Sequence, residues 1–465
     1  MRWVKSRAYI KMPTNRKNLL MFDSLLYWQE PETIYLDVTN HCNLKCKMCP
    51  HSMKDIQFEK GHMEWEFFKK VISQIDNTKS LSLFASGEPL IAKNWDRILK
   101  YCLEEKKFSD CISFSTNGLF LNEQRARRIL GKNVAFSVSI DGGTKSTYES
   151  IRKGGRFEVL LKNLRFFRDC KRRYNTDKPF LSFTFVAWKD NIMELPLVIK
   201  LASEFDSKQV TLIHRIFYKK EDFDKYSLCN YRETFDTCLE KSLELAGKLG
   251  IKLIHTGTFS RNIAPTKGLK EIYFKERADG ALCCRTVDEH VIIGFKGLIR
   301  ACCFIDKLFM GNLNFDSLGG IWNGPNYRNL RLKLYKGDYP DGCKNCSFVQ
   351  ILGKEEIACL CPLNTKTFIS ASPEIKQSYD IITVNEEFIN AMEGYKKGFI
   401  KIDHLIKKLL LLWEKDNNFF EIANNLAVLY ALKGDVSNAK KWIIIAKKII
   451  AGDPIIEKNY AYLIQ

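Results

Sequence analysis

The stretch Thr33-Ile-Tyr-Leu-Asp-Val-Thr-Asn-His-Cys-Asn-Leu-Lys-Cys-Lys-Met-Cys49-Pro50 decides the fold. It begins as an apolar β-type run, Thr33–Val38, and continues into a loop with the spacing Cys42-x3-Cys46-x2-Cys49. Because cysteine thiolates hold iron–sulfur clusters, three of them on one loop can take three corners of a 4Fe–4S cube. The loop has no fourth cysteine, so one iron would stay open to an exchangeable ligand. Structural zinc prefers four closed ligands at paired spacings, which this loop does not offer.

Short β-type runs alternate with amphipathic stretches from Thr33 to about Gly250. The expected strands are Thr33–Val38, Leu81–Ala85, Ile112–Ser115, Val134–Ile140, Phe180–Ala187 and Gln209–His214. Helical patterns lie between them, for example Glu64–Ile75, Glu123–Leu130, Phe157–Asp169 and Ile192–Glu204. Strands separated by helices indicate an α/β fold with a parallel sheet. We expect a partial (β/α)6 TIM-like barrel with its chemistry at the carboxyl ends of the strands.

The sixteen cysteines stand out in a chain of 465 residues. No secretory signal is visible, and the longest apolar run, Leu426–Leu432, is too short for a membrane span. We therefore expect a cytoplasmic protein, in which cysteines serve as metal ligands more often than as disulfides. Cysteines that occur singly in strand or helix patterns are expected to be core residues: Cys102, Cys111, Cys170, Cys229 and Cys238.

The cysteine loop after the first strand resembles the defining motif of the radical S-adenosylmethionine (SAM) superfamily. The resemblance implies that SAM chelates the open iron through its amino and carboxylate groups. One electron, from a low-potential donor such as flavodoxin or ferredoxin, would cleave SAM to methionine and a 5′-deoxyadenosyl radical. That radical would abstract hydrogen from an unactivated carbon–hydrogen bond of the substrate.

Further stretches resemble the SAM-binding positions of the same superfamily. Ser86-Gly87-Glu88-Pro89 is similar to the glycine–glutamate loop that holds the methionine ammonium, with Ser86 where a glycine is more usual. Arg152 resembles the arginine that pairs with the methionine carboxylate. Polar residues at the ends of the third and fourth strands would serve the ribose hydroxyls and that carboxylate. The implied cofactor-binding residues are Ser86, Gly87, Glu88, Ser115, Asn117, Ser139 and Arg152.

A second cysteine group, Cys284-x12-Gly297-x4-Cys302 followed by Cys343-x2-Cys346, resembles the SPASM/twitch extension of the superfamily. The resemblance makes these four cysteines the ligands of one auxiliary 4Fe–4S cluster, so two clusters are expected in all. Cys283 fits the spacing nearly as well as Cys284, and zinc on the same four thiolates is the alternative. Cys359 and Cys361 do not complete the spacing of a second auxiliary cluster.

Cys303 stands next to the expected ligand Cys302. Because neighbouring residues of an extended strand point to opposite faces, both cannot easily bind one cluster. Cys303 would then be either a hydrogen-atom or proton donor in the substrate pocket or an inert core thiol.

Four units are expected along the chain. They are a basic N-terminal extension (1–30), the barrel (31–250), a small cysteine-rich α+β domain (251–380) and an all-α tail (381–465). The tail resembles a tetratricopeptide-type hairpin, with a generic helical hairpin as the alternative. The tail could also carry a site for a protein partner.

The formal charge of +19 raises the possibility of nucleic-acid binding. Its distribution argues against that function, because six basic residues fall in the first twenty positions and no basic–aromatic stripe follows. The leading hypothesis is a radical SAM enzyme acting on a small, sugar-like molecule or on a peptide. RNA modification and a non-catalytic iron–sulfur protein are the less favoured alternatives.

Overall fold

The structure is a computed structural model of the chain, and it describes most of the two expected central domains and the tail. The described residues are 30–53, 59–75, 78–106, 108, 110–267, 274–276, 282–302, 309–335, 338, 343, 387–388, 390–392, 394–395, 398–417, 419–451 and 453–464. Several residues named above lie outside these ranges: Cys283, for its side chain, and Cys303, Cys346, Cys359 and Cys361. All but the last residue of the basic N-terminal extension also lies outside them.

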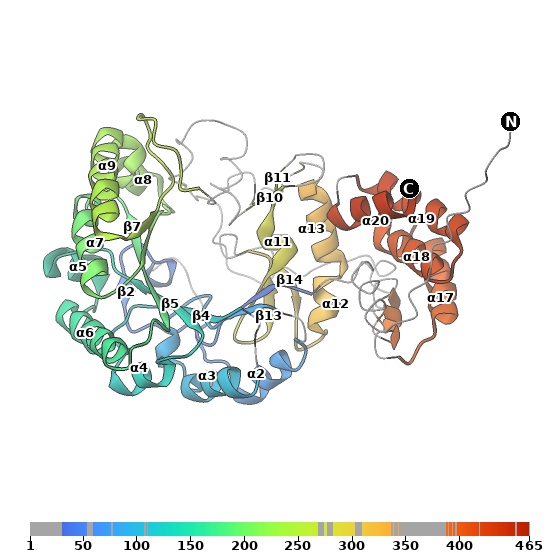
Figure 1. Cartoon of the computed structure of the whole chain (residues 1–465), viewed down its shortest axis with the longest axis horizontal. Helices are drawn as coiled ribbons and strands as arrows, with labels where there is room; N and C mark the ends of the chain where they lie inside the picture. Colours follow the sequence, from blue (N-terminus) through green and yellow to red (C-terminus); the bar gives the residue numbers. More distant parts are fainter. Residues whose placement is uncertain are drawn as a thin grey trace.

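One ten-stranded mixed sheet runs through the molecule in the order β14-β13-β12-β1-β3-β4-β5-β7-β8-β9 (Figure 1). Six of its strands are the predicted ones: β1 (Thr33–Leu36), β3 (Ser80–Ser82), β4 (Ile112–Thr116), β5 (Val134–Ser139), β7 (Phe180–Ala187) and β8 (Gln209–His214). A seventh strand, β9 (Lys252–Ile254), was not predicted and lies just beyond the expected barrel bounds. All their pairings are parallel. The predicted TIM-like α/β fold is confirmed, as an open sheet rather than a closed barrel.

Helices cover the convex side of this sheet (Figure 1). They are α2 (Trp65–Ile72), α3 (Trp95–Glu104), α4 (Glu123–Ile129), α5 (Lys145–Ile151), α6 (Phe157–Arg173), α7 (Leu195–Glu204) and α9 (Arg232–Leu249). The short helix α8 (Lys220–Tyr226) instead follows the carboxyl end of β8. The predicted helix Ile192–Glu204 is a short 3-10 turn, η3 (Ile192–Glu194), followed by α7. Pro196 explains the break, because proline lacks the N–H that a continuous helix would need there.

The alternation of side chains along the strands defines two faces of the sheet. Phe114 of β4 and Phe136 of β5 stack with ring centroids 5.3 Å apart, and Phe136 contacts Phe167 of α6. The intervening residues therefore face the concave side, where Ser137 and Thr184 share a hydrogen bond of 2.7 Å. We call this concave, polar side the inner face.

The sheet continues beyond the barrel into the cysteine-rich part of the chain. β12 (His290–Ile293) adds parallel to β1, and β13 (Leu298–Arg300) and β14 (Phe309–Asn312) follow antiparallel. Gly297, at φ +90°, forms the predicted turn between β12 and β13. Residues on both sides of position 250 thus share one sheet and one core, while the domain bounds themselves stay a prediction.

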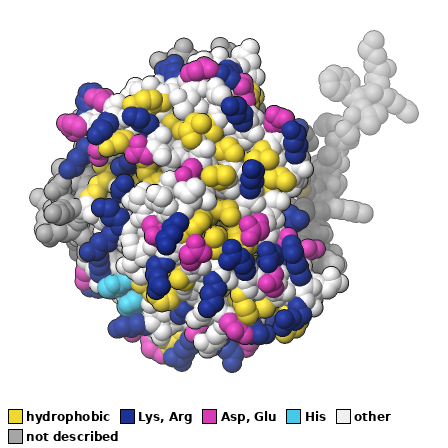
Figure 2. All heavy atoms as spheres, turned by 90° about the vertical axis from the view of Figure 1, so that its left-hand side faces the viewer, with side chains coloured by type: hydrophobic (Ala, Val, Ile, Leu, Met, Phe, Trp, Pro, Cys, Tyr) yellow, Lys and Arg dark blue, Asp and Glu magenta, His cyan; other side chains and the backbone are white. Residues whose placement is uncertain are grey.

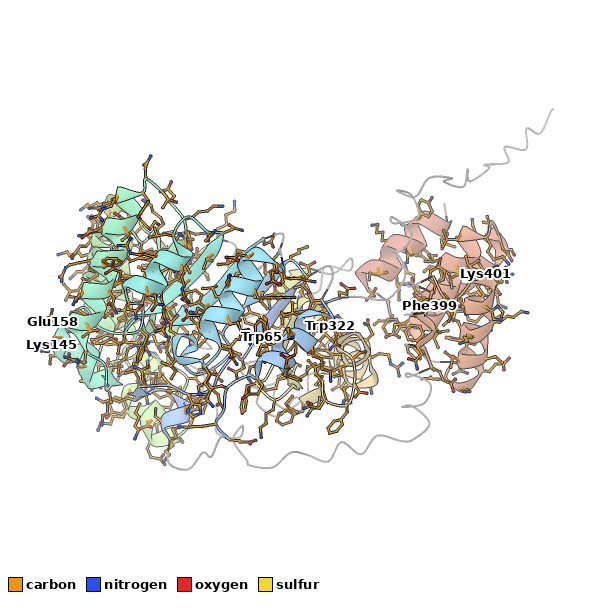
Figure 3. The ribbon with its side chains drawn as sticks, turned by 90° about the horizontal axis from the view of Figure 1, so that it is seen from below. Trp65, Lys145, Glu158, Trp322, Phe399 and Lys401 are labelled. Atoms are coloured by element: carbon orange, nitrogen blue, oxygen red, sulfur yellow. The ribbon has the colours of Figure 1, made fainter. Side chains whose placement is uncertain are left out.

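Smaller elements complete this region. β10 (Phe274–Glu276) and β11 (Leu282–Cys284) form a separate two-stranded ladder, followed by α11 (Arg285–Glu289), α12 (Leu318–Trp322) and α13 (Pro325–Tyr335). The residues after β14 reach back to α2, because Lys70 donates to the carbonyl of Leu313 and Leu318 donates to Gln74. In Figure 3, Trp65 of α2 and Trp322 of α12 accordingly both lie in the middle of the molecule.

The C-terminal region is helical, as predicted. It contains α17 (Ile402–Lys415), α18 (Phe420–Leu432), α19 (Val436–Ile449) and α20 (Pro454–Ile464), which have a core of their own. Figure 3 shows Phe399 and Lys401 in this separate unit. Assignment of the tail to the tetratricopeptide class stays a prediction. Within the described ranges, no helix is long and apolar enough to cross a membrane.

Candidate functional site

The three clustered cysteines lie directly after β1, at the carboxyl edge of the sheet. Lys45–Cys46 (β2) pairs antiparallel with Arg152–Lys153 (β6), which sets Cys46 opposite Arg152. Lys47 N–H donates to the carbonyl of Ile151 at 2.9 Å. Cys42 is exposed, Cys49 half-buried and Cys46 buried. Backbone hydrogen bonds thus fix the cysteine loop to the end of α5. The three thiols lie within eight consecutive residues of this loop, Cys42 to Cys49.

Glu88 lies fully buried between β3 and β4. Its carboxylate accepts hydrogen bonds from the N–H of Asn117 at 2.7 Å, the hydroxyl of Thr116 at 2.6 Å and the N–H of Leu90 at 3.2 Å. Burial raises the pKa of Glu88, and these hydrogen bonds act in the opposite direction. A carboxylate offers about four acceptor positions, so one remains for an ammonium group.

Gly87 allows the Ser86–Glu88 turn to press against the chain that leads into the cysteine loop. Its φ is +69°, and a Cβ at this position would lie 2.5 Å from the carbonyl oxygen of His41 and 2.7 Å from that of Thr39. Glu88 N–H donates to the same His41 carbonyl at 2.8 Å. Only glycine fits here, which couples the position of this turn to that of Cys42.

The other predicted cofactor residues lie at neighbouring strand ends. The amide of Asn117 donates to the side chain of Asn43 at 2.8 Å and so ties the end of β4 to the cysteine loop. Ser115 and Ser139 are half-buried and, by alternation with buried Phe114 and Val138, lie on the inner face. The sheet therefore brings the predicted residues together along one edge.

Arg152 is buried beside Cys46. Its Nη2 lies 2.7 Å from Oδ2 of Asp141, a fully buried carboxylate that follows β5, and its Nη1 lies 3.9 Å from Sγ of Cys46. Burial acts to lower the pKa of Arg152, but Asp141 and Cys46 outweigh it and raise the pKa. Arg152 is paired with Asp141, so a bound carboxylate would have to share that guanidinium.

The thiols of the loop suit an iron–sulfur cluster. Burial raises the pKa of Cys46 to about 12, with Arg152 acting against it, and burial also raises the pKa of Cys42 and Cys49. Such thiols ionise when a metal supplies positive charge. In the part of the chain that the structure describes, no three His, Cys, Asp or Glu side chains converge on a single-ion site. A cube takes one thiolate per iron and so accommodates ligands that are spread apart.

The auxiliary cysteines are described in part. Cys284 ends β11, Cys302 lies two residues beyond β13, and Cys343 is buried. Cys284, Cys302 and Cys343 all belong to the same hydrophobic core as the barrel. Cys346 and Cys303 lie outside the described residues, so the ligand set and the role of Cys303 stay predictions. Of the expected core cysteines, Cys102, Cys170 and Cys238 are buried, and Cys111 and Cys229 are half-buried.

Asp37 was not anticipated from the sequence. It follows β1 on the inner face and accepts hydrogen bonds from the N–H of Ser86 at 3.0 Å and the hydroxyl of Ser86 at 2.7 Å. Burial raises its pKa to about 6, against the hydrogen bonds from Ser86 and the charge of Arg300 on β13. An acidic residue between an apolar strand and a metal-binding loop was the signal that could have identified it.

Two segments of the chain match known protein families. Residues 36–181 match the Radical SAM superfamily, and residues 283–347 match SPASM, an iron–sulfur cluster-binding domain. Radical SAM domains bind SAM and a 4Fe–4S cluster, and SPASM domains bind auxiliary iron–sulfur clusters.

Among curated proteins, the chain is 26% identical over 339 residues to the "tungsten-containing aldehyde ferredoxin oxidoreductase cofactor-modifying protein" of Pyrococcus furiosus. That match covers 68% of this chain and 86% of the relative. The chain is also 27% identical over 217 residues to Fe-coproporphyrin III synthase of Methanosarcina barkeri, covering 46% of this chain. It spans about half of that relative's length, 52%.

Solved structures of the same fold support the architecture. The structure of anSMEcpe with bound AdoMet superposes with a TM-score of 0.52 at 17% identity, covering 78% of this chain and 99% of that one. Streptococcus suis SuiB bound to its precursor peptide SuiA gives 0.50 at 15% identity, covering 76% and 80%. The chain therefore contains a radical SAM domain of the TIM-like α/β fold, followed by a SPASM domain and a helical C-terminal region.

Proposed function

We propose that this protein cleaves SAM reductively and uses the 5′-deoxyadenosyl radical to abstract hydrogen from an unactivated carbon–hydrogen bond of its substrate. The observation that carries the proposal is the convergence at one sheet edge of the Cys42–Cys49 loop, the buried Glu88 turn and the Arg152–Asp141 pair. When bound, the reduced cluster supplies the electron that cleaves SAM. An external low-potential donor, such as flavodoxin or ferredoxin, would replenish it.

The chain's own residues would hold and orient SAM. Cys42, Cys46 and Cys49 would bind three irons. The remaining acceptor position of Glu88, together with the carbonyls of the turn, suits the methionine ammonium. The guanidinium of Arg152 suits the methionine carboxylate, with Asp141 fixing its orientation.

The remaining polar groups would orient the nucleoside end of SAM. Ser115, Asn117 and Ser139 lie along the inner face, where they can reach the ribose hydroxyls. Ser86 and Gly87 would contribute the backbone of the ammonium-binding turn. The rest of the inner face would then be left for the substrate.

The proposed auxiliary 4Fe–4S cluster would be held by Cys284, Cys302, Cys343 and Cys346. β12 pairs directly with β1, so the segment leading to Cys302 is continuous with the sheet that positions the first cluster. Zinc at the same thiolates is the alternative, and iron analysis distinguishes the two metals.

Two substrate classes remain, a small sugar-like molecule and a peptide or protein recruited through the helical tail. A relative is named as a cofactor-modifying protein, which favours a small molecule, whereas SuiB of the same fold is solved with a precursor peptide. Nucleic acid is the less favoured partner. On the face shown in Figure 2, acidic and hydrophobic side chains are interspersed among the basic ones.

The test is anaerobic reconstitution with dithionite and SAM, followed by incubation with deuterated candidate metabolites and peptides. A true substrate would transfer deuterium into 5′-deoxyadenosine. If every candidate leaves 5′-deoxyadenosine unlabelled and no SAM is cleaved under any condition, a non-catalytic iron–sulfur role is favoured instead.

Cys303 has its own test once a substrate is known. Loss of product in Cys303→Ala with both clusters retained would identify a hydrogen or proton donor. Full activity would leave it a core thiol, and loss of a cluster would make it a ligand in place of Cys302.

A further inference from the structure

Arg215 lies in a box of aromatic rings at the carboxyl end of β8. Its guanidinium carbon is 5.0 Å from the ring centroid of Trp188, 4.8 Å from that of Phe217 and 6.0 Å from that of Tyr226. Arg215 is 8% exposed, and Trp188 and Phe217 are each 1% exposed. Aromatic faces attract a cation and fix the plane of a guanidinium, so the side chain is held in one orientation.

This guanidinium has no anionic partner among the residues that the structure describes. Its Nε is buried without a hydrogen bond, and no described carboxylate forms an ion pair with it. Asp222 and Asp190 are near enough to favour its charged form, but burial outweighs them and lowers the pKa of Arg215. A buried charge without a hydrogen-bonded partner is strongly unfavourable, so such a group is expected to serve a ligand.

The box adjoins the proposed SAM site. Arg215 N–H bonds to the carbonyl of Ala187, which extends the β7–β8 ladder to the rim of the sheet. Val186 lies two residues beyond Thr184 and so shares the inner face, and it packs against the cluster that contains Trp188. Trp188, Phe217 and Ile151 form one apolar cluster.

The same apolar cluster reaches the cysteine loop itself. Met48, which lies between Cys46 and Cys49, packs against it, as do Phe223 and Tyr226. Ile151 is the residue before Arg152, whose backbone pairs with Cys46. An anion bound at Arg215 would therefore lie on the inner face. Only the apolar cluster of Ile151, Trp188 and Phe217 would separate it from the cysteine loop.

We infer that Arg215 binds an anionic group of the substrate, a carboxylate or a phosphate, and so selects substrates that carry one. A guanidinium presents a planar fork of N–H donors that matches both groups, and its charge-assisted hydrogen bonds would offset the cost of its burial. Aromatic ring faces are poor hydrogen-bond acceptors. The N–H groups of the Arg215 guanidinium therefore remain available to donate to a ligand. This inference rests on the proposed function only in assigning the anion to the substrate.

The test compares wild-type protein, reconstituted and saturated with SAM, with Arg215→Met. The probes are inorganic phosphate and succinate, added at constant ionic strength, and the readouts are Tm and equilibrium binding of each probe. Wild-type Tm should rise with at least one probe, and Arg215→Met should bind that probe at least about tenfold more weakly. Which probe binds tells phosphate from carboxylate.

Stability without probe separates a binding role from a structural one. Removal of an unpaired buried charge should leave the Tm of Arg215→Met equal to or above that of the wild type. Arg97→Gln is the matched control, because Arg97 also stacks on a tryptophan, 3.9 Å from the Trp65 centroid, but is exposed. Arg97→Gln should respond to the probes as the wild type does. A loss of response in Arg215→Met alone would then not be a general effect of salt on stability.

Three results would overturn the inference. One is equal probe binding by wild type and Arg215→Met. Another is a Tm of Arg215→Met several degrees below the wild type, which would show a structural role. The last is a parallel loss of SAM binding, which would assign Arg215 to the cofactor's own carboxylate. Iron content and SAM cleavage are measured separately, so failure of the proposed function would be seen independently.

Discussion

Glu88 and Asp37 are buried carboxylates at neighbouring strand ends, and their surroundings give them different tasks. Glu88 accepts from two backbone N–H groups and a hydroxyl, so it is fixed to the end of β4. Among the described residues, Ser86 alone donates hydrogen bonds to the carboxylate of Asp37, and the positive charge of Arg300 on β13 acts on the same carboxylate. We expect Glu88 to contact SAM and Asp37 to position the turn that does so.

Replacement of Glu88 by glutamine tests the first of these roles. The amide NH2 would face the donor N–H of Asn117 or, if the amide is turned over, the donors of Thr116 and Leu90, and the substitution removes the negative charge offered to an ammonium. SAM affinity should fall about 10- to 100-fold with iron content unchanged, measured by equilibrium binding and iron analysis. Glu149→Gln is the control: its amide oxygen can still accept from the N–H of Phe157, and it should bind SAM normally. A parallel loss of iron would indicate a structural role for Glu88.

Replacement of Asp37 by asparagine tests the second role through its pH dependence. The pKa of folded Asp37, about 6, is raised above its ordinary value of 3.8. Its folded form therefore holds a proton that the unfolded form has lost, and the free energy of unfolding should decrease as pH rises from about 4 to above 6. Asp37→Asn should abolish this slope in denaturant titrations.

SAM binding should show the opposite trend, because only the ionised carboxylate accepts both hydrogen bonds from Ser86. Wild-type affinity should fall as pH drops through about 6, and Asp37→Asn should be weaker and flat. Asp236→Asn is the control, since Asp236 is a buried carboxylate that holds the N–H groups of Phe259 and Ser260 elsewhere. Identical pH profiles for wild type and Asp37→Asn would contradict a positioning role.

The residue types and spacing of the cysteine loop predicted a cluster site, and the family resemblance predicted the role of the Ser86–Glu88 turn. They did not identify Asp37, Asp141 as the partner of Arg152, or Arg215. Asp37 and Ser86 are 49 positions apart and meet only because β1 pairs with β3. Contacts of this kind follow from strand order, which a single sequence does not state.

At the scale of elements, the Ser86–Glu88 turn and the segment Thr39–His41 act as one unit. They touch at Gly87, where backbone carbonyls leave no space for a side chain. The turn that would hold SAM and the loop that would hold iron are thus placed by one contact.

Gly87→Ala should separate this contact from general backbone strain when it is compared with Gly131→Ala. Both glycines have positive φ, +69° and +71°, but nothing lies within 4 Å of a Cβ at Gly131. Both variants should lose about 1–2 kcal/mol of stability from the left-handed conformation. Only Gly87→Ala should also lose SAM binding and iron, measured on purified protein. Equal behaviour of the two variants would show that the close packing has no functional effect.

Element types followed well from the sequence, whereas some boundaries did not. Phe180–Ala187 and Gln209–His214 form strands with the predicted bounds, because both are rich in aromatic and β-branched residues and lie between helical patterns. The predicted Leu81–Ala85 strand is observed as Ser80–Ser82, since its end bends into the Glu88 turn. Tertiary contacts at the site therefore override the local pattern.

At the scale of the whole molecule, α13 of the SPASM region contacts the helical tail. Arg328 of α13 is 6% exposed, lies 3.8 Å from the ring centroid of Phe419 and is 3.7 Å from Asp416. Glu421 of α18 is buried at the same place, and burial raises its pKa to about 8 against the charges of Arg328 and Arg331. The tail thus contacts the SPASM region through Arg328 and its acidic neighbours. The order of helices along the sequence could not reveal this contact.

Arg328→Met should weaken this junction. Removal of Arg328 leaves Asp416 and Glu421 without this cation, so the amides of α18 should exchange hydrogen faster. Lys441→Met, which removes an exposed cation 5.8 Å from the Trp442 ring within the tail, should leave exchange unchanged. Unchanged protection of α18 in Arg328→Met would show that apolar contacts alone hold the tail.

The central claim, that Cys42, Cys46 and Cys49 hold the cluster at which SAM is cleaved, is tested most directly by replacing all three with alanine. We expect about eight irons per wild-type chain, about four in the variant, and no 5′-deoxyadenosine from the variant with SAM and dithionite. A double variant of the half-buried cysteines, Cys111→Ala and Cys229→Ala, should keep both iron and activity. Persistent cleavage of SAM by the triple variant would contradict the account.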